Sequence, residues 1–137
     1  MSDGGSLSEV HRPLSERERE ILELLLSVEL DGIGALREQV PHALAARWGC
    51  GCASFDLVVD QDVAPRSSIT TSPTVEAWSK QRDDPDKTFE LLLWVKDGWL
   101  SGVEIVDFVE RHGDQSPDEI PSLDYWAAPR AYEGHRG

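Results

Sequence analysis

The chain has 137 residues, of which 13 are lysine or arginine and 26 are aspartate or glutamate, so its formal net charge is −13. This length predicts one domain that can bury a core without disulfides or metal. The negative charge argues against nucleic acid and anionic membranes as partners, because both present phosphate groups. A signal-peptide apolar segment and a run of about 20 apolar residues are both missing from the sequence, so we expect a cytoplasmic protein with no membrane span.

The first predicted element is a helix. Residues 1–13 are rich in glycine and serine, and we expect them to be a flexible N-terminus. Ser15 and Glu18 have the spacing of a capping box, which predicts a helix that begins near Glu16. Its apolar residues recur at i, i+3, i+4 and i+7 and predict a buried stripe of Ile21, Leu24, Leu25 and Val28.

A second short helix is predicted over Ile33–Val40, before a proline. The next segment, Ala43–Trp48, fits a strand or a continued helix, and we favour the strand. Ala53–Val59 alternates apolar and mixed positions, which is typical of a half-buried strand. Ile69–Thr71 and Val75–Ser79 are also β-prone, with a proline between them.

Thr88–Phe108 is typical of a β-hairpin with Asp97-Gly98 at its turn. A two-residue loop would pair Lys96 with Trp99. A three-residue loop would instead pair Val95 with Trp99 and place Gly98 at positive φ before a bulge.

We favour the three-residue loop because it separates an apolar face from a mixed face. The apolar face would carry Phe89, Leu91, Leu93, Ser101, Val103 and Ile105. The mixed face would carry Glu90, Leu92, Trp94, Leu100, Gly102 and Glu104. This register sets Glu90 opposite Glu104, a like-charge pair that destabilises a sheet by roughly 0.2–1 kcal/mol.

The mixed face predicts an interaction surface. The two helices offer apolar stripes for one sheet face, which leaves Leu92, Trp94 and Leu100 on the other. Large apolar groups left exposed usually mark a contact surface. We therefore expect Trp94 to be covered by the tail residues Leu123–Trp126, by a second subunit or by a partner protein.

Cys50 and Cys52 form the one cysteine pair of the chain. Two thiolates at this spacing could bind zinc or copper, with His42 as a third ligand, or cycle through a strained disulfide. They could equally be small residues at a turn beside flexible glycines. A zinc site needs about four ligands, so we expect free thiols, no bound metal and no cofactor.

The fold class we predict is α+β, with two N-terminal helices packed on one face of a four- to five-stranded antiparallel sheet. A single domain over residues 14–126 would be followed by a flexible tail over residues 127–137. The sequence contains no nucleophile-elbow, zinc-protease or phosphate-loop motif, and we assign no catalytic residue.

Four segments carry a resemblance to a small family of actinobacterial proteins without an established activity. They are Gly32–Val40, Cys50–Val59, Leu91–Phe108 and Ile120–Asp124. The resemblance spans roughly residues 14–124. It implies the same α+β order of elements and brings no substrate or site residue.

Three functional hypotheses follow. The first is a non-enzymatic, acidic, cytoplasmic module that binds a protein partner, either as an inhibitor or immunity-type protein or as a homodimer. The second is a metal- or thiol-dependent protein that uses Cys50 and Cys52. The third is an enzyme with a site on the open sheet face.

Overall fold

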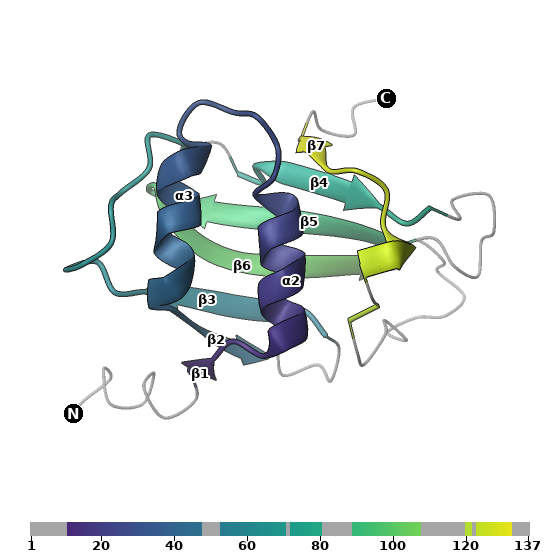
Figure 1. Cartoon of the computed structure of the whole chain (residues 1–137), viewed down its shortest axis with the longest axis horizontal. Coiled ribbons are helices and arrows are strands. Elements are labelled where there is room, and N and C mark those ends of the chain that lie inside the picture. Colours follow the sequence, from purple (N-terminus) through teal and green to yellow (C-terminus); the bar gives the residue numbers. More distant parts are fainter. Residues whose placement is uncertain are drawn as a thin grey trace.

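A seven-stranded antiparallel sheet forms one layer of the protein, with the strand order β1-β2-β3-β6-β5-β4-β7 (Figure 1). The computed structural model describes residues 11–47, 53–70, 72–80, 89–107, 120–121 and 123–132. The strands are β1 (Arg12–Pro13), β2 (Ala43–Arg47), β3 (Phe55–Val59), β4 (Val75–Trp78), β5 (Phe89–Lys96), β6 (Trp99–Asp107) and β7 (Arg130–Ala131).

The sheet is larger than the four or five strands expected from the sequence. The two additional strands, β1 and β7, are each two residues long and form its opposite edges. Arg12 pairs with Ala45 of β2, and Arg130 pairs with Glu76 of β4. The sheet therefore includes residues on both sides of the expected domain of residues 14–126. The predicted α+β class with an antiparallel sheet is confirmed.

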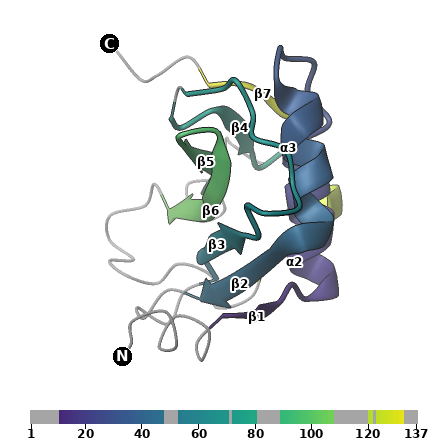
Figure 2. The same ribbon diagram turned by 90° about the vertical axis from the view of Figure 1, so that its left-hand side faces the viewer.

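Two helices, α2 (Glu16–Leu25) and α3 (Ile33–Gln39), lie on one side of the sheet (Figure 2). The predicted capping box is confirmed, because the Ser15 hydroxyl accepts a hydrogen bond from the Glu18 amide and the Ser15 amide donates to the Glu18 carboxylate. The buried stripe is shifted from the prediction, since Leu24 and Val28 are half-buried. The fully buried apolar residues of this segment are Ile21, Leu22, Leu25 and Leu26.

The β5–β6 hairpin corrects the predicted register. Lys96 pairs with Trp99, and Asp97 and Gly98 have φ values of 54° and 88°, so the loop has two residues in a turn of the type I′ class. The positive φ predicted for Gly98 is confirmed, and the pairing of Val95 with Trp99 is wrong. A bulge follows at once, because Val95 pairs with Leu100 and Trp94 pairs with Gly102.

The bulge restores most of the predicted division between the two faces. Ser101 is the extra residue on β6, and beyond it Leu93 pairs with Val103 and Leu91 with Ile105. These four residues are buried in the same core as the helices. Glu90, in contrast, pairs with Val106 and not with Glu104, so the expected like-charge pair does not form.

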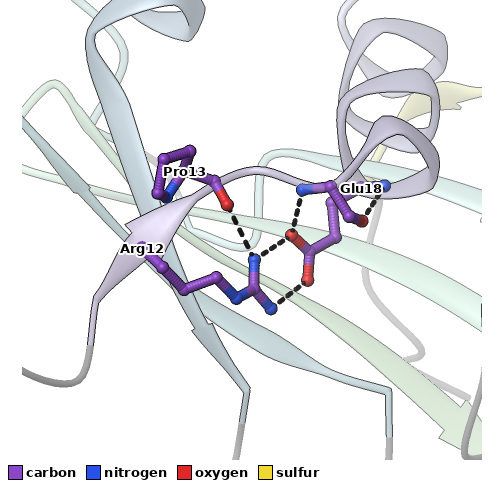
Figure 3. A network of polar contacts seen from close by, with 4 residues as sticks. Arg12, Pro13 and Glu18 are labelled. Carbon is purple, nitrogen blue, oxygen red and sulfur yellow. Dashed lines mark hydrogen bonds and ion pairs between the residues drawn. The ribbon is translucent and has the colours of Figure 1, made fainter.

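The edge strand β1 is tied to α2 by a charged hydrogen-bond network (Figure 3). The guanidinium of Arg12 donates to both carboxylate oxygens of Glu18, with 2.8 Å between Nη2 and Oε2, and also to the Pro13 carbonyl. The Glu18 side chain is 4% exposed. The network therefore links β1 to α2 through one paired, buried carboxylate.

Candidate interaction face

The sheet face opposite α2 and α3 is called the open face below, because no helix covers it within the described residues (Figure 2). Residues that pair directly across antiparallel strands share a face. Leu44 pairs with Val58 and Asp56 with Gly102 on this face. Gly102 also pairs with Trp94. Further residues of the open face are Glu76, Trp78, Glu90, Leu92, Glu104 and Arg130.

Two polar contacts organise this face. Glu76, Leu92 and Glu104 form one row across β4, β5 and β6. The Trp94 indole donates to Glu104, with 3.1 Å from Nε1 to Oε1. Arg130 of β7 donates to Glu76, with 2.9 Å from Nε to Oε2. The contacts hold one tryptophan in place and attach β7 to the sheet.

One end of the open face is buried. Glu76, Glu90 and Leu92 are 2%, 1% and 8% exposed, and Trp94 is half-buried. Burial of ionised carboxylates is costly unless they are paired. The ion pair with Arg130 meets this requirement for Glu76. This end is therefore part of the folded interior and offers little surface to a partner.

The other end of the open face exposes apolar side chains. Leu44 of β2 and Val58 of β3 are directly opposite each other and are 37% and 41% exposed. They line a hollow of about 330 Å³, which also includes Pro41, His42 and Asp60. A second hollow of about 300 Å³ shares Val58 and extends to Lys96 and Trp99. The exposed pair is therefore continuous with a groove along β3.

The structure places the three predicted interaction residues on different faces of the sheet. Leu92 and Trp94 are on the open face as expected. Leu100 is not, because its position between the turn and the bulge pairs it with Val95 and places it in the core at 2% exposure. Of the tail residues expected to cover Trp94, Trp126 belongs to the core. Tyr125 packs at the edge of the core, where the centroid of its ring lies 6.1 Å from that of Phe89.

Sequence reasoning missed the exposed pair. The alternation of residues in β3 predicts that Phe55, Leu57 and Val59 face the core. Val58 is then an apolar residue that faces outward. Leu44 carried no such signal, because β2 is mostly alanine.

The candidate metal site is outside the part of the chain that can be tested. Cys50 and Cys52 lie outside the described residues, and His42 is exposed in the 3-10 turn η1 (Val40–His42). Within the described residues, His, Cys, Asp and Glu side chains nowhere gather in a group of three that could hold a metal ion. In the same part of the chain, both helices are too short or too polar to cross a membrane.

Comparisons with known proteins add no homology to this geometry. A scan against protein-family models, a search of curated proteins and a search of solved structures each found no match. Any functional conclusion must therefore come from the residues themselves.

Proposed function

We propose that this protein is a non-enzymatic interaction module that binds a basic protein partner through the exposed end of its open face. The observation that carries the proposal is the exposed apolar pair Leu44 and Val58 beside a groove. An apolar centre with a polar rim is the usual anatomy of a protein–protein interface.

The charge around the pair selects the kind of partner. Asp56 and Asp60 are exposed beside Val58, and Glu104 lies further along the same face. Lys96 contributes a positive charge at the far end of the groove. With a net charge of −13, a second copy of the chain would be repelled, whereas a basic protein would be attracted and steered to this face. An inhibitor or immunity-type role would fit such binding.

The experiment is affinity capture from the native cell with three forms of the protein. Wild type is compared with a Leu44→Ser/Val58→Ser double variant and with Val63→Ser. Val63 is 59% exposed in the loop after β3, so it serves as a matched exposed valine away from the paired strands. A basic protein retained by wild type and Val63→Ser, and lost from the double variant, is the expected result.

Sedimentation of the purified protein tests the homodimer. A monomer at low and high salt supports the basic partner. A dimer that the double variant converts to a monomer would replace the proposal by self-association through the same face. Equal capture by all three forms would refute the open face as the contact surface.

A further inference from the structure

The strand β3 is paired on both sides at its start and on one side only at its end. It pairs with β2 along its whole length, up to Val59 with Ala43. Its pairing with β6 covers two positions and ends at Asp56 with Gly102. Within the described residues, no strand therefore pairs with Val59 on the side of β3 that faces β6 (Figure 1).

The alternation of hydrogen bonds along β3 shows where the Val59 backbone points. The Asp60 amide donates to the His42 carbonyl at 3.0 Å, one position beyond the last pair of β2 with β3. Hydrogen-bonded and non-hydrogen-bonded pairs alternate in antiparallel strands, so Val58 bonds to β2 and Val59 does not. The amide and carbonyl of Val59 therefore point away from β2, on the side of the hollow of about 300 Å³ that Val59 lines.

The nearby part of β6 does not close this hollow by strand pairing. The Leu100 amide, which also lines the hollow, donates to the Gln39 side chain at 2.9 Å. Trp99, the next residue toward the turn, pairs with Lys96 of β5. The end of β3 is therefore a short strand edge inside the sheet, and such an edge can accept an added strand.

The surroundings of this edge favour an added strand with basic side chains. Asp60 and Asp62 are exposed directly after β3, and Asp97 is exposed in the hairpin turn. Lys96 is the one positive charge that lines the hollow. Three carboxylates against one ammonium group attract a basic segment. Val58, exposed on the open face beside the same edge, offers this segment an apolar contact.

We propose that the partner contributes an extended basic segment, which adds to β3 as a strand in this hollow and pairs with the backbone of Val59. The inference rests on the proposed function, since the same open face supplies the apolar contact, and it adds the form in which the partner binds. Main-chain hydrogen bonds give affinity in strand addition, while alternate side chains of the segment lie on the face of Val58.

Hydrogen exchange measured by NMR tests this pairing. The probe is a short, end-capped peptide of alternating lysine and valine, added to the full chain at low ionic strength. In the free protein, the Val59 amide should exchange faster than the Val58 amide, which bonds to β2. Bound peptide should slow exchange at Val59 by roughly tenfold or more, because the amide gains a hydrogen bond. Unchanged exchange at Val59, or a peptide that does not bind, refutes strand addition.

Modified peptides separate backbone pairing from side-chain contacts. In two N-methylated versions, the methyl groups block the amides of one edge of the extended peptide or of the other. Only one version should lose binding, because only one edge of the peptide faces β3. Equal binding of both versions would mean that side chains alone hold the peptide. A version with glutamate in place of lysine should bind at least roughly tenfold more weakly, and equal binding would overturn the basic segment.

The Leu44→Ser/Val58→Ser variant separates this inference from the proposed function. If the variant loses the peptide but exchange at Val59 never changes in the wild type, the open face is the contact surface and strand addition is refuted. If peptide protects Val59 equally in both proteins, strand addition holds and the apolar pair is not the centre of the contact.

Discussion

The backbone amide of Leu100 in β6 donates to the side-chain oxygen of Gln39 in α3 across 2.9 Å. The paired ladder of β3 and β6 is limited to Phe55 with Val103 and Asp56 with Gly102, so Leu100 lies beyond it. Gln39 also donates from Nε2 to the carbonyls of Pro65 and Gly98, and its side chain is fully buried. One amide side chain therefore satisfies three backbone groups at the end of the hairpin.

Replacement of Gln39 by leucine should be strongly destabilising. Leucine has a similar size, but it removes the Gln39 oxygen that accepts from the buried Leu100 amide, and an unsatisfied buried group costs about 1–3 kcal/mol. The Gly98 carbonyl keeps its hydrogen bond from the Ser67 amide. We expect a loss of roughly 2 kcal/mol or more, measured by urea unfolding with tryptophan fluorescence. Glu38→Ala, at the exposed neighbouring position of α3, is the control. A loss no larger than that of the control would show that these hydrogen bonds are dispensable.

Gly98 and Gly34 should respond in opposite directions to alanine. At Gly98, φ is 88° and a Cβ atom would collide with the Ser67 carbonyl oxygen. Gly98→Ala should therefore destabilise the protein by about 1–3 kcal/mol or more through backbone strain. At Gly34, inside α3, a Cβ atom would meet nothing within 4 Å. Gly34→Ala should therefore raise the free energy of unfolding by about 0.5–1 kcal/mol. Thermal melting measures both changes: the melting temperature should fall for Gly98→Ala and rise for Gly34→Ala. A Gly98→Ala protein that melts at the wild-type temperature would contradict the prediction.

The hairpin shows how far sequence reasoning reaches here. The predicted register has a three-residue loop, and the observed one has a two-residue loop followed by one bulge residue. Beyond the bulge, both registers place the same side chains on each face. Hydrophobic alternation therefore predicted the core positions of Leu91, Leu93 and Val103 correctly. It could not locate the bulge, because Ser101 has no local signature. Leu100 lies between turn and bulge, and its face was therefore assigned wrongly.

The sheet edges were beyond prediction for a different reason. A strand of two residues, such as Arg12–Pro13 or Arg130–Ala131, is too short to show alternation. Both strands are held by tertiary ion pairs, Arg12 with Glu18 and Arg130 with Glu76.

The contribution of Glu18 to stability should depend on pH. Burial acts to raise the pKa of Glu18, but hydrogen bonds from Arg12 and Ser15 outweigh it, so the pKa lies below its ordinary value. A carboxyl group with a lowered pKa in the folded state stabilises the protein above its unfolded pKa and loses this effect as the pH falls through the folded value.

Glu18→Gln should therefore lower the free energy of unfolding by about 1–3 kcal/mol at neutral pH. The difference from wild type should shrink as the pH falls below about 4. Urea unfolding at several pH values measures this, with Glu16→Gln, at an exposed position of the same first turn, as the control. A difference that stays constant down to the acid limit would disprove the linkage.

Arg130 should anchor β7. Its Nε donates to Glu76, which is nearly fully buried, while the Arg130 side chain is 58% exposed. Arg130→Ala removes this partner, and because the pair is partly screened by water we expect a loss of about 1–2 kcal/mol. Hydrogen exchange at the Tyr132 amide, which bonds to the Thr74 carbonyl, should become faster. Lys80→Ala, at an exposed basic residue after β4, should leave both values unchanged.

The strand order also dictates when the sheet can assemble during synthesis. The strands β1, β2 and β3 leave the ribosome in the order in which they pair, but the inner neighbour of β3 is β6, which begins at Trp99. Until β6 emerges, a nascent chain must carry the inner edge of β3 without its partner, and an unpaired edge of this kind attracts other chains. The emergence of β6 up to Asp107 therefore separates an aggregation-prone nascent chain from one whose central strands can pair.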